Sequence, residues 1–302
     1  MAADNKEQVS TVRRAKHGGA LTVLFTIISI LWIAPILIVI LNSFKRKAFI
    51  FRYPFGISTA KITEGWSKFA EGAKRMFCGL LNYQNGAKTT NFFSCFGNSL
   101  FITVGAVLLI VLCCSMCAWY IVRVKTKGTK IMYTLCLFSM IVPFQMVMFT
   151  LSKFANMLHL SNPLGIIIVY LGFGAGLAVF MFTGFVKSIS LEIEEAAMID
   201  GCTPLQTFFL VVFPILKPTT VTVAILEAMW VWNDYLLPSL VLNINKYKTI
   251  PIAVQYLKQS HGQIDWGAMM AVLVLAILPI VIFYIACQKY IIEGVLAGAV
   301  KG

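Results

Sequence analysis

The segment SLEIEEAAMIDGCTPLQTFFLVVFPILKP, residues 190–218, is the one long acidic and amphipathic stretch in a chain that is otherwise mostly apolar. Ser190 is a suitable N-cap, because its hydroxyl can accept a hydrogen bond from a backbone N–H of the first helical turn. Gly201 predicts the left-handed residue that follows the end of this helix. Negative side chains in the first turns favour the positive end of the helix dipole, and three glutamates stand there: Glu192, Glu194 and Glu195.

A second helix start follows at once. Thr203 reads as its N-cap, Pro204 as its first residue, and Gln206 as the residue that reaches back in a capping box. Pro214 and Pro218 are expected to end this helix and to begin the next segment. The sequence therefore predicts a pair of short helices, set at an angle, between two apolar runs.

A helix pair of this kind can serve as a docking element for another protein. Ala196 and Ala197 keep one face low, so that a partner can approach closely. The alternative is an interfacial pair that lies on lipid headgroups. Three acidic residues near an anionic membrane surface make a poor lipid-binding face, which favours the docking interpretation.

The composition indicates a membrane protein. Hydrophobic residues make up 59% of the 302 residues and charged residues 12%, about half the share that is usual in soluble proteins. One soluble core could not hide this excess. In a soluble protein the net charge of +13 would suggest nucleic acid as a partner, but the basic residues here concentrate in loops and tails. We expect membrane lipid, and no nucleic acid, as the surroundings of this chain.

The predicted fold is an all-α polytopic membrane protein with six transmembrane helices, a long first external loop and an inner loop that carries the helix pair. Residues 1–19 form a polar tail, and the apolar run after them is too long for a signal-peptide core. Residues 20–302 form the transmembrane domain. The runs long enough to cross a bilayer are 20–43, 97–122, 131–154, 164–186, 218–242 and 267–291.

The distribution of lysine and arginine predicts that both termini are cytoplasmic. The basic loop Arg123–Lys130 is expected on the inside, since the next connection, near His159, is almost free of charge. Lys45–Lys47 favours the opposite orientation, but it lies in a long loop, where the rule is weak. This orientation places the loop 44–96 outside and the loop 188–218 inside. The outer loop is expected to form a small cap with one or two short helices, in contact with a substrate-delivering partner or another membrane subunit.

The cysteines indicate neither a metal site nor a redox site. Cys113, Cys114 and Cys117 sit in an apolar run without a neighbouring histidine or carboxylate, so no metal is expected. Cys78 and Cys95 fall in the same predicted external loop, which leaves a disulfide between them open. The sequence has no Gly-x-x-x-x-Gly-Lys-Ser/Thr, His-Glu-x-x-His or Gly-x-Ser-x-Gly motif, so we expect a non-catalytic chain with no nucleotide site or cofactor of its own.

The fifth apolar run carries unusual polar and aromatic residues. An ionised group at mid-membrane depth costs about 2.5–3.5 kcal/mol, so these residues should face protein or a water-filled cavity. Rings beside carboxylates and amides suit sugars, whose C–H faces stack and whose hydroxyls need hydrogen-bond partners. The alternative is that Asn233 and Asp234 cap a break in the helix. The candidate pathway residues are Gln145, beside the expected kink at Pro143, and Glu227, Trp230, Trp232, Asn233 and Asp234.

The fourth apolar run contains several glycines, and because glycine has no side chain we expect neighbouring helices to pack closely there. They are Gly172, Gly174, Gly176 and Gly184.

The central segment resembles the EAA loop of the permease subunits of bacterial ABC importers. The spacing runs from Glu195–Ala196–Ala197 to Gly201 and then to Val211–Val212–Phe213–Pro214, where the family usually has Ile-x-Leu-Pro. The similarity covers roughly residues 92–302 and is greatest to the carbohydrate branch, specifically the second, shorter permease of the maltose-type pair. Supporting stretches are Asn162–Gly165, Trp232–Asp234, Asp265–Gly267 and Gly294–Gly302.

The resemblance implies a role in coupling. In such permeases the loop docks into a cleft of a cytoplasmic ATPase and transmits its motion, with Glu195 expected to engage a basic residue there. The C-terminal tail, residues 292–302, would insert between two ATPase subunits through Gly298 and Lys301. The seam between permeases would include Trp232–Asp234, and the sugar would be held chiefly by the other permease. The residues carried over as coupling residues are Glu194, Glu195, Ala196, Ala197, Asp200, Gly201 and Pro214.

The resemblance also implies the assembly and its location. The partners are a homologous second permease, two ABC ATPase subunits that bind ATP and Mg²⁺, and an extracytoplasmic sugar-binding protein, all at the bacterial cytoplasmic membrane. Two alternatives stay open. A stand-alone secondary transporter or channel would need intramembrane charged pairs or inverted repeats, which are not evident. An ABC permease for an amino acid, phosphate or metal would lack the carbohydrate-branch stretches.

Overall fold

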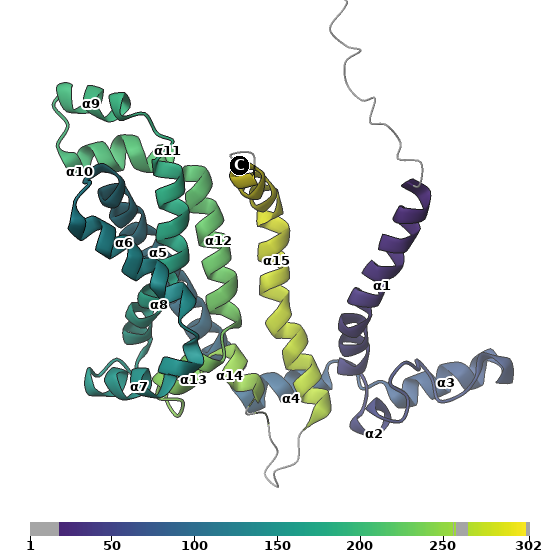
Figure 1. Ribbon diagram of the computed structural model, residues 1–302. Coiled ribbons are helices and arrows are strands. Elements are labelled where there is room, and N and C mark those ends of the chain that lie inside the picture. The colour runs from purple at the N-terminus through teal and green to yellow at the C-terminus, as the bar shows by residue number, and fades with distance from the viewer. Residues whose placement is uncertain (1–17, 256, 258–264, 300–302) are drawn as a thin grey trace, which may run out of the picture. The chain divides into compact units, whose positions relative to one another are not determined.

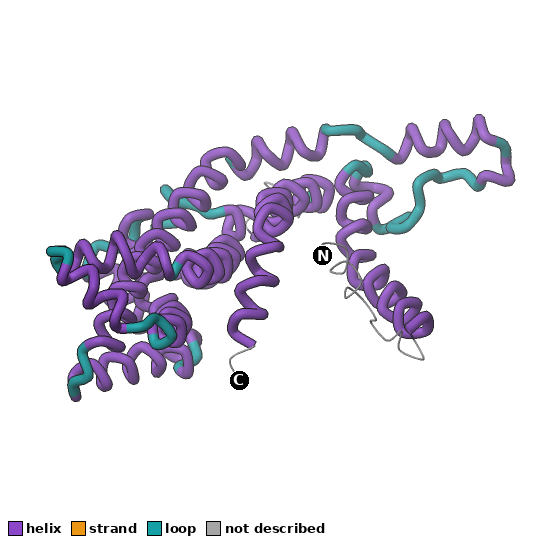
Figure 2. The backbone as a smooth tube through the Cα atoms, turned by 90° about the horizontal axis from the view of Figure 1, so that it is seen from above, coloured by secondary structure: helices purple, strands orange, loops and turns teal. Residues whose placement is uncertain are grey.

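The computed structural model describes residues 18–255, 257 and 265–299, and throughout these ranges every extended regular element is a helix (Figures 1 and 2). The predicted all-α membrane architecture is confirmed. The chain forms two compact units, residues 1–82 and 83–302.

The first unit consists of one apolar helix and a mostly helical loop. α1 has a mean hydropathy of 2.9 over Leu21–Ser43, so it is long and apolar enough to span a bilayer. The loop after it contains more helix than the sequence predicts. The elements of the first unit are α1 (Gly18–Ser43), α2 (Lys47–Ile50), the 3₁₀ turn η1 (Ile62–Glu64) and α3 (Trp66–Met76).

Buried polar side chains hold this loop at the end of α1. The Lys45 side chain is fully buried, and its ammonium donates hydrogen bonds to the carbonyl oxygens of Tyr53 at 2.8 Å and Pro54 at 3.1 Å. Burial lowers the pKa of Lys45, because desolvation penalises its charged form. The Asn82 amide donates to the carbonyls of Ser43 at 2.7 Å and Lys45 at 2.8 Å. The Asn82 bonds tie this side chain to the last residue of α1 and to the first residues of the loop.

The structure has no disulfide between Cys78 and Cys95, since both are free thiols. Each donates a hydrogen bond to a nearby backbone carbonyl instead, Cys78 to Phe44 and Cys95 to Thr90, both at 3.3 Å. Each sulfur therefore has its own partner, a distant one for Cys78 and a local one for Cys95.

The second unit is a helical bundle centred on α5 and α8, which pack along each other. α4 joins it to the first unit. The helices are α4 (Leu81–Thr90), α5 (Phe92–Arg123), α6 (Lys127–Ile141), α7 (Phe144–Met157), α8 (Pro163–Val186), α9 (Leu191–Ile199), α10 (Pro204–Gln206), the π-helical η2 (Thr207–Val212), α11 (Phe213–Ile215), α12 (Lys217–Asn233), α13 (Leu236–Val241), α14 (Ile250–Gln255) and α15 (Trp266–Ala299).

Two of the six predicted spans are not continuous helices. Among the described residues four helices are long and apolar enough to cross a bilayer, or up to six spans if each of two bent pairs counts as one. The third predicted span consists of α6 and α7. The chain bends by 108° between them, because Pro143 cannot continue the hydrogen-bond ladder. The fifth, predicted at 218–242, divides into α12 and α13 at Asp234–Tyr235. The second bent pair is a different one, Pro204–Ile215 with α12. The second span starts at Phe92, before the predicted residue 97.

The C-terminal segment is helical as far as Ala299. α15 runs to Ala299, so most of the expected tail 292–302 continues the last span, Gly298 included. Glycine in a helix interior costs about 1 kcal/mol relative to alanine, which the surrounding good helix formers outweigh. Lys301 and residues 1–17 of the predicted N-terminal tail lie outside the described residues.

We predict that replacing Asn82 with leucine loosens the external loop. The change removes two hydrogen bonds, each of which contributes about 0.5–1.5 kcal/mol to stability. Limited trypsin digestion should cut the basic positions between residues 46 and 75 faster than in the wild type. Asn85→Leu, at an exposed position of the same helix, is the control. Equal digestion of both variants would contradict the assigned role of Asn82.

Candidate functional site

The predicted helix pair forms with the predicted caps. α9 begins after Ser190, whose hydroxyl accepts the Glu192 N–H at 3.3 Å. Gly201 follows with φ of +92°, a conformation that L side chains rarely adopt, so it reverses the chain without strain. α9 and the segment α10–α11 lie together at one end of the second unit (Figure 1).

The second helix ends at Ile215, directly after Pro214, and Pro218 stands in the first turn of α12, as predicted. The Thr203 capping box is present, with the Gln206 N–H donating to Thr203 at 3.4 Å and the Thr203 N–H donating to Gln206 Oε1 at 2.8 Å. The segment Pro204–Ile215 then continues through a π-helical stretch and meets α12 at 77°. Pro214 is tolerated because it stands in the first turn of α11, where its missing N–H matters least.

The predicted coupling role would require Glu194 to face outward. Its side chain is instead buried against its own chain. It is 1% exposed. Arg123, at the end of α5, donates to Glu194 Oε1 from Nη2 at 2.6 Å and from Nε at 2.9 Å. The Trp119 indole donates to the other oxygen, Oε2, at 2.9 Å. We call Trp119, Arg123 and Glu194 the α5–α9 clamp.

The clamp also fixes the chain that leads into α9. Arg123 Nη2 donates to the Ile189 carbonyl at 3.0 Å, so one guanidinium holds both the approach to α9 and its first turn. Charge-assisted, two-point contacts of this kind set orientation as well as distance.

The opposite face of α9 is open. Glu195, Ala196 and Asp200 are exposed, and Ile199 is 86% exposed. Ala197, in contrast, is buried. The predicted coupling residues therefore divide into an inner set that holds the helix and an outer set that a partner can reach.

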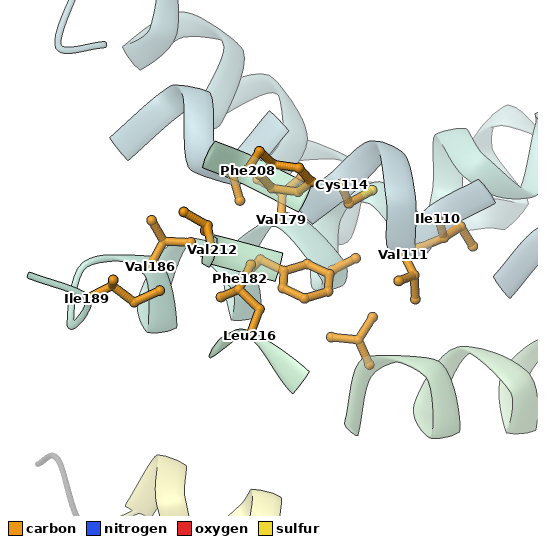
Figure 3. Packing of buried hydrophobic residues seen from close by; sticks show 13 residues of the cluster. Ile110, Val111, Cys114, Val179, Phe182, Val186, Ile189, Phe208, Val212 and Leu216 are labelled. Carbon is orange, nitrogen blue, oxygen red and sulfur yellow. The ribbon is translucent and has the colours of Figure 1, made fainter. Parts of the chain in front are cut away.

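The second helix of the loop is part of the hydrophobic core. Phe208, Val212 and Leu216 are fully buried among side chains of α5 and α8, Phe182 of α8 among them (Figure 3). The Phe208 ring lies 5.4 Å from the Trp119 ring, which links this core to the clamp. Because the loop shares its core with two long helices, displacement of α9 should displace them as well.

The polar residues at the end of α12 make the contacts of a helix break. Asp234 Oδ1 accepts the N–H groups of Leu236 at 2.9 Å and Leu237 at 3.3 Å, and the Tyr170 hydroxyl donates to Oδ2 at 3.0 Å. The Asn233 amide donates to the Met229 carbonyl at 2.7 Å. These are the contacts that the capping alternative predicts.

Glu227 lies apart from that break, in a cavity between α8 and α12. Its side chain is 2% exposed, and its Oε2 has no hydrogen-bond partner among the described residues. The cavity has a volume of about 220 Å³. Its lining residues are Phe173, Gly174, Leu177, Leu226, Glu227 and Trp230.

The other candidate pathway residues lie elsewhere. Trp232 packs edge-on against Phe96, with ring centroids 5.8 Å apart, and Gln145 is exposed near the start of α7. Within the described ranges no group of His, Cys, Asp or Glu side chains could hold a metal ion.

Sequence reasoning missed two members of the clamp. Arg123 counted only as a charge that sets orientation, and Trp119 only as part of an apolar run. Their position at the end of a span was visible in the sequence, but the glutamate that they bind lies about 70 residues further along the chain.

Comparison with known proteins gives the class of this chain. Residues 110–296 match the family described as binding-protein-dependent transport system inner membrane component. A probable permease of a starch degradation products transport system from Thermoanaerobacterium thermosulfurigenes is 37% identical over 93% of this chain and 96% of its own length. A permease of a multiple sugar-binding transport system from Streptococcus mutans is 32% identical, over 92% and 95%.

Solved structures agree on the fold. A chain of a bacterial ABC transporter involved in the import of the acidic polysaccharide alginate superimposes with a TM-score of 0.71 at 21% identity, covering 93% of this chain and 98% of that one.

The family match and these relatives thus identify a non-catalytic membrane permease. The chain belongs to the family of inner membrane components of binding-protein-dependent transport systems. The resemblance to permeases of carbohydrate ABC importers, seen in the sequence, is confirmed by these relatives.

We predict that Glu194→Ala destabilises the protein strongly. Removing one partner of a buried ion pair costs on the order of 3–5 kcal/mol, because the other charge loses its counter-ion. The apparent melting temperature of the purified permease in nanodiscs should fall, and tryptophan emission should report it, since Trp119 touches the site.

Glu195→Ala, at the next and exposed position, is the matched control and should change stability by no more than about 0.5 kcal/mol. Equal melting of the two variants would show that the clamp does not hold α9.

Proposed function

We propose that this permease carries di- or oligosaccharides inward across a bacterial cytoplasmic membrane, as half of a translocation pathway. The supporting relatives are named for starch degradation products and for multiple sugars, and they match nearly the whole chain. The partners would be a homologous permease, two ATPase subunits that bind ATP and Mg²⁺, and an extracytoplasmic sugar-binding protein.

The observation that carries the coupling part of the proposal is the two-sided character of α9. Its inner face is held by Glu194, 1% exposed, and its outer face presents Glu195, Ala196 and Asp200. An ATPase that grips the outer face would move α9, and the clamp would pass that motion to α5. Ala196 leaves room for close approach, and Glu195 offers a charge to a basic residue of the partner.

The proposed orientation keeps the predicted one. Both termini and the loop 188–218 face the cytoplasm, where ATP is available, and the basic loop that includes Arg123 is on the same side. The loop 44–96 then faces outward, where it can meet the binding protein or the sister permease. The end of α15, including Gly298, would approach the ATPases.

Co-expression with the proposed partners, the second permease, the ATPase subunits and the sugar-binding protein, tests the proposal. An ATPase should co-purify with this chain, and proteoliposomes should take up maltotriose only with ATP inside and the binding protein outside. Transport by the purified chain alone would favour a secondary transporter or channel. ATP-dependent uptake of an amino acid, phosphate or metal instead of saccharides would keep the assembly and overturn the cargo.

We predict that Gly201→Val uncouples transport from ATP hydrolysis. No atom lies within 4 Å of a Cβ built at Gly201, so the expected effect comes from backbone conformation, where φ of +92° strains a β-branched residue by about 1–3 kcal/mol. Fewer sugar molecules should enter per ATP hydrolysed, while membrane insertion is unchanged.

Gly201→Asn is the control for this substitution. Asparagine tolerates positive φ better than other residues with a side chain, so its coupling ratio should lie between those of wild type and the valine variant. A wild-type ratio in the valine variant would contradict the proposed turn.

A further inference from the structure

We propose that this permease itself holds one uncharged sugar ring, in the cavity between α8 and α12, with Glu227 as hydrogen-bond acceptor and Trp230 as stacking surface. The inference rests on the proposed function and extends it, because it gives this subunit a direct part in recognising the cargo.

The carboxylate of Glu227 lacks the partner that a buried charge requires. Oε2 is buried with no hydrogen-bond partner among the described residues, although the side chain is only 2% exposed. A buried acceptor left unsatisfied destabilises the protein, and a charged one does so more strongly. The nearby break in α12 does not use it, since Asp234 makes those contacts. Glu227 also lines the cavity, so a ligand bound there would contact its side chain.

α8 leaves room for this carboxylate at Gly174. A Cβ built on Gly174 would lie 2.9 Å from Glu227 Oε2 and 2.6 Å from Ile110 Cδ1. Real side chains essentially never approach so closely, so alanine at this position would displace the carboxylate or the isoleucine. On the same helix, a Cβ on Gly184 would meet nothing within 4 Å. The glycine at 174 thus has a local purpose beyond general helix packing.

The cavity also has an aromatic wall, on which a ligand ring could stack. Phe173 and Trp230 line it, and Trp230 is 41% exposed, so this wall can be reached from outside the chain. The Tyr170 ring fixes the indole edge-on, with centroids 5.3 Å apart. A ring held in place beside an unpaired acceptor suits a pyranose, which offers an apolar C–H face and hydroxyl donors.

Size and charge define the ligand further. A volume of about 220 Å³ is below the roughly 300–1,000 Å³ of pockets for drug-sized ligands, which fits one ring of a longer saccharide. A carboxylate at this position repels anionic sugars. The site should therefore accept neutral rings and reject uronates, unlike a pathway for an acidic polysaccharide.

The test uses the complete transporter in nanodiscs, without binding protein, so that only the permeases contribute the sugar site. The probe is [¹⁴C]maltotriose, measured by equilibrium dialysis in the ATP- and vanadate-trapped state, with its C6-oxidised uronate as competitor. Loss of a hydrogen bond to a charged group corresponds to at least about tenfold. We expect Glu227→Gln to weaken maltotriose binding about tenfold and to let the uronate compete.

Two glycine variants separate the site from general destabilisation. Gly174→Ala should weaken binding as Glu227→Gln does, while Gly184→Ala should bind as the wild type. All three should assemble with the ATPases, and the control Gly184→Ala should also hydrolyse ATP at the wild-type basal rate.

Unchanged maltotriose binding in both Glu227→Gln and Gly174→Ala would overturn the inference while leaving the proposed function intact. So would a Glu227→Gln variant that fails to assemble but binds normally in its assembled fraction, because Glu227 would then pair with the sister permease. A wild-type complex that transports no saccharide would instead overturn the proposed function, and the inference with it.

Discussion

One buried ion pair determines how the proposed coupling loop can act. Arg123 and Glu194 meet through two hydrogen bonds, of 2.6 and 2.9 Å, and Trp119 satisfies the remaining oxygen. A buried charge that is fully paired is stable, whereas a half-paired one is costly, so this contact favours a single arrangement of α9 on α5. The position of α9 is thereby tied to the transmembrane bundle, although α9 is short and mostly exposed.

The rest of the second unit is consistent with that constraint. The loop's second helix is seated between α5 and α8 through Phe208, Val212 and Leu216, so both halves of the loop are attached to the same pair of long helices. The cavity at Glu227 lies along α8 as well. A displacement at the exposed face of α9 can therefore reach the proposed sugar site through packed side chains, without a hinge between them.

The sequence predicts most of what local chemistry controls. The caps at Ser190 and Thr203 and the reversal at Gly201 depend on residues close in sequence, and they form as predicted. Contacts between distant residues were not predictable. Nothing within residues 190–218 says that Glu194 meets Arg123 while Glu195 remains free. The sequence also does not predict that a glycine in α8 makes room for a carboxylate in α12.

The central claim, that α9 moves as one body with α5, is tested most directly by spin-label distances in the assembled transporter. Labels on cysteines introduced at the exposed positions Ile199 and Tyr120 report the separation of α9 from α5, and a third label on the sister permease reports relative motion. On ATP binding the first distance should stay unchanged while the distance from Ile199 to the sister permease shifts. A change in the distance from Ile199 to Tyr120 would contradict the account.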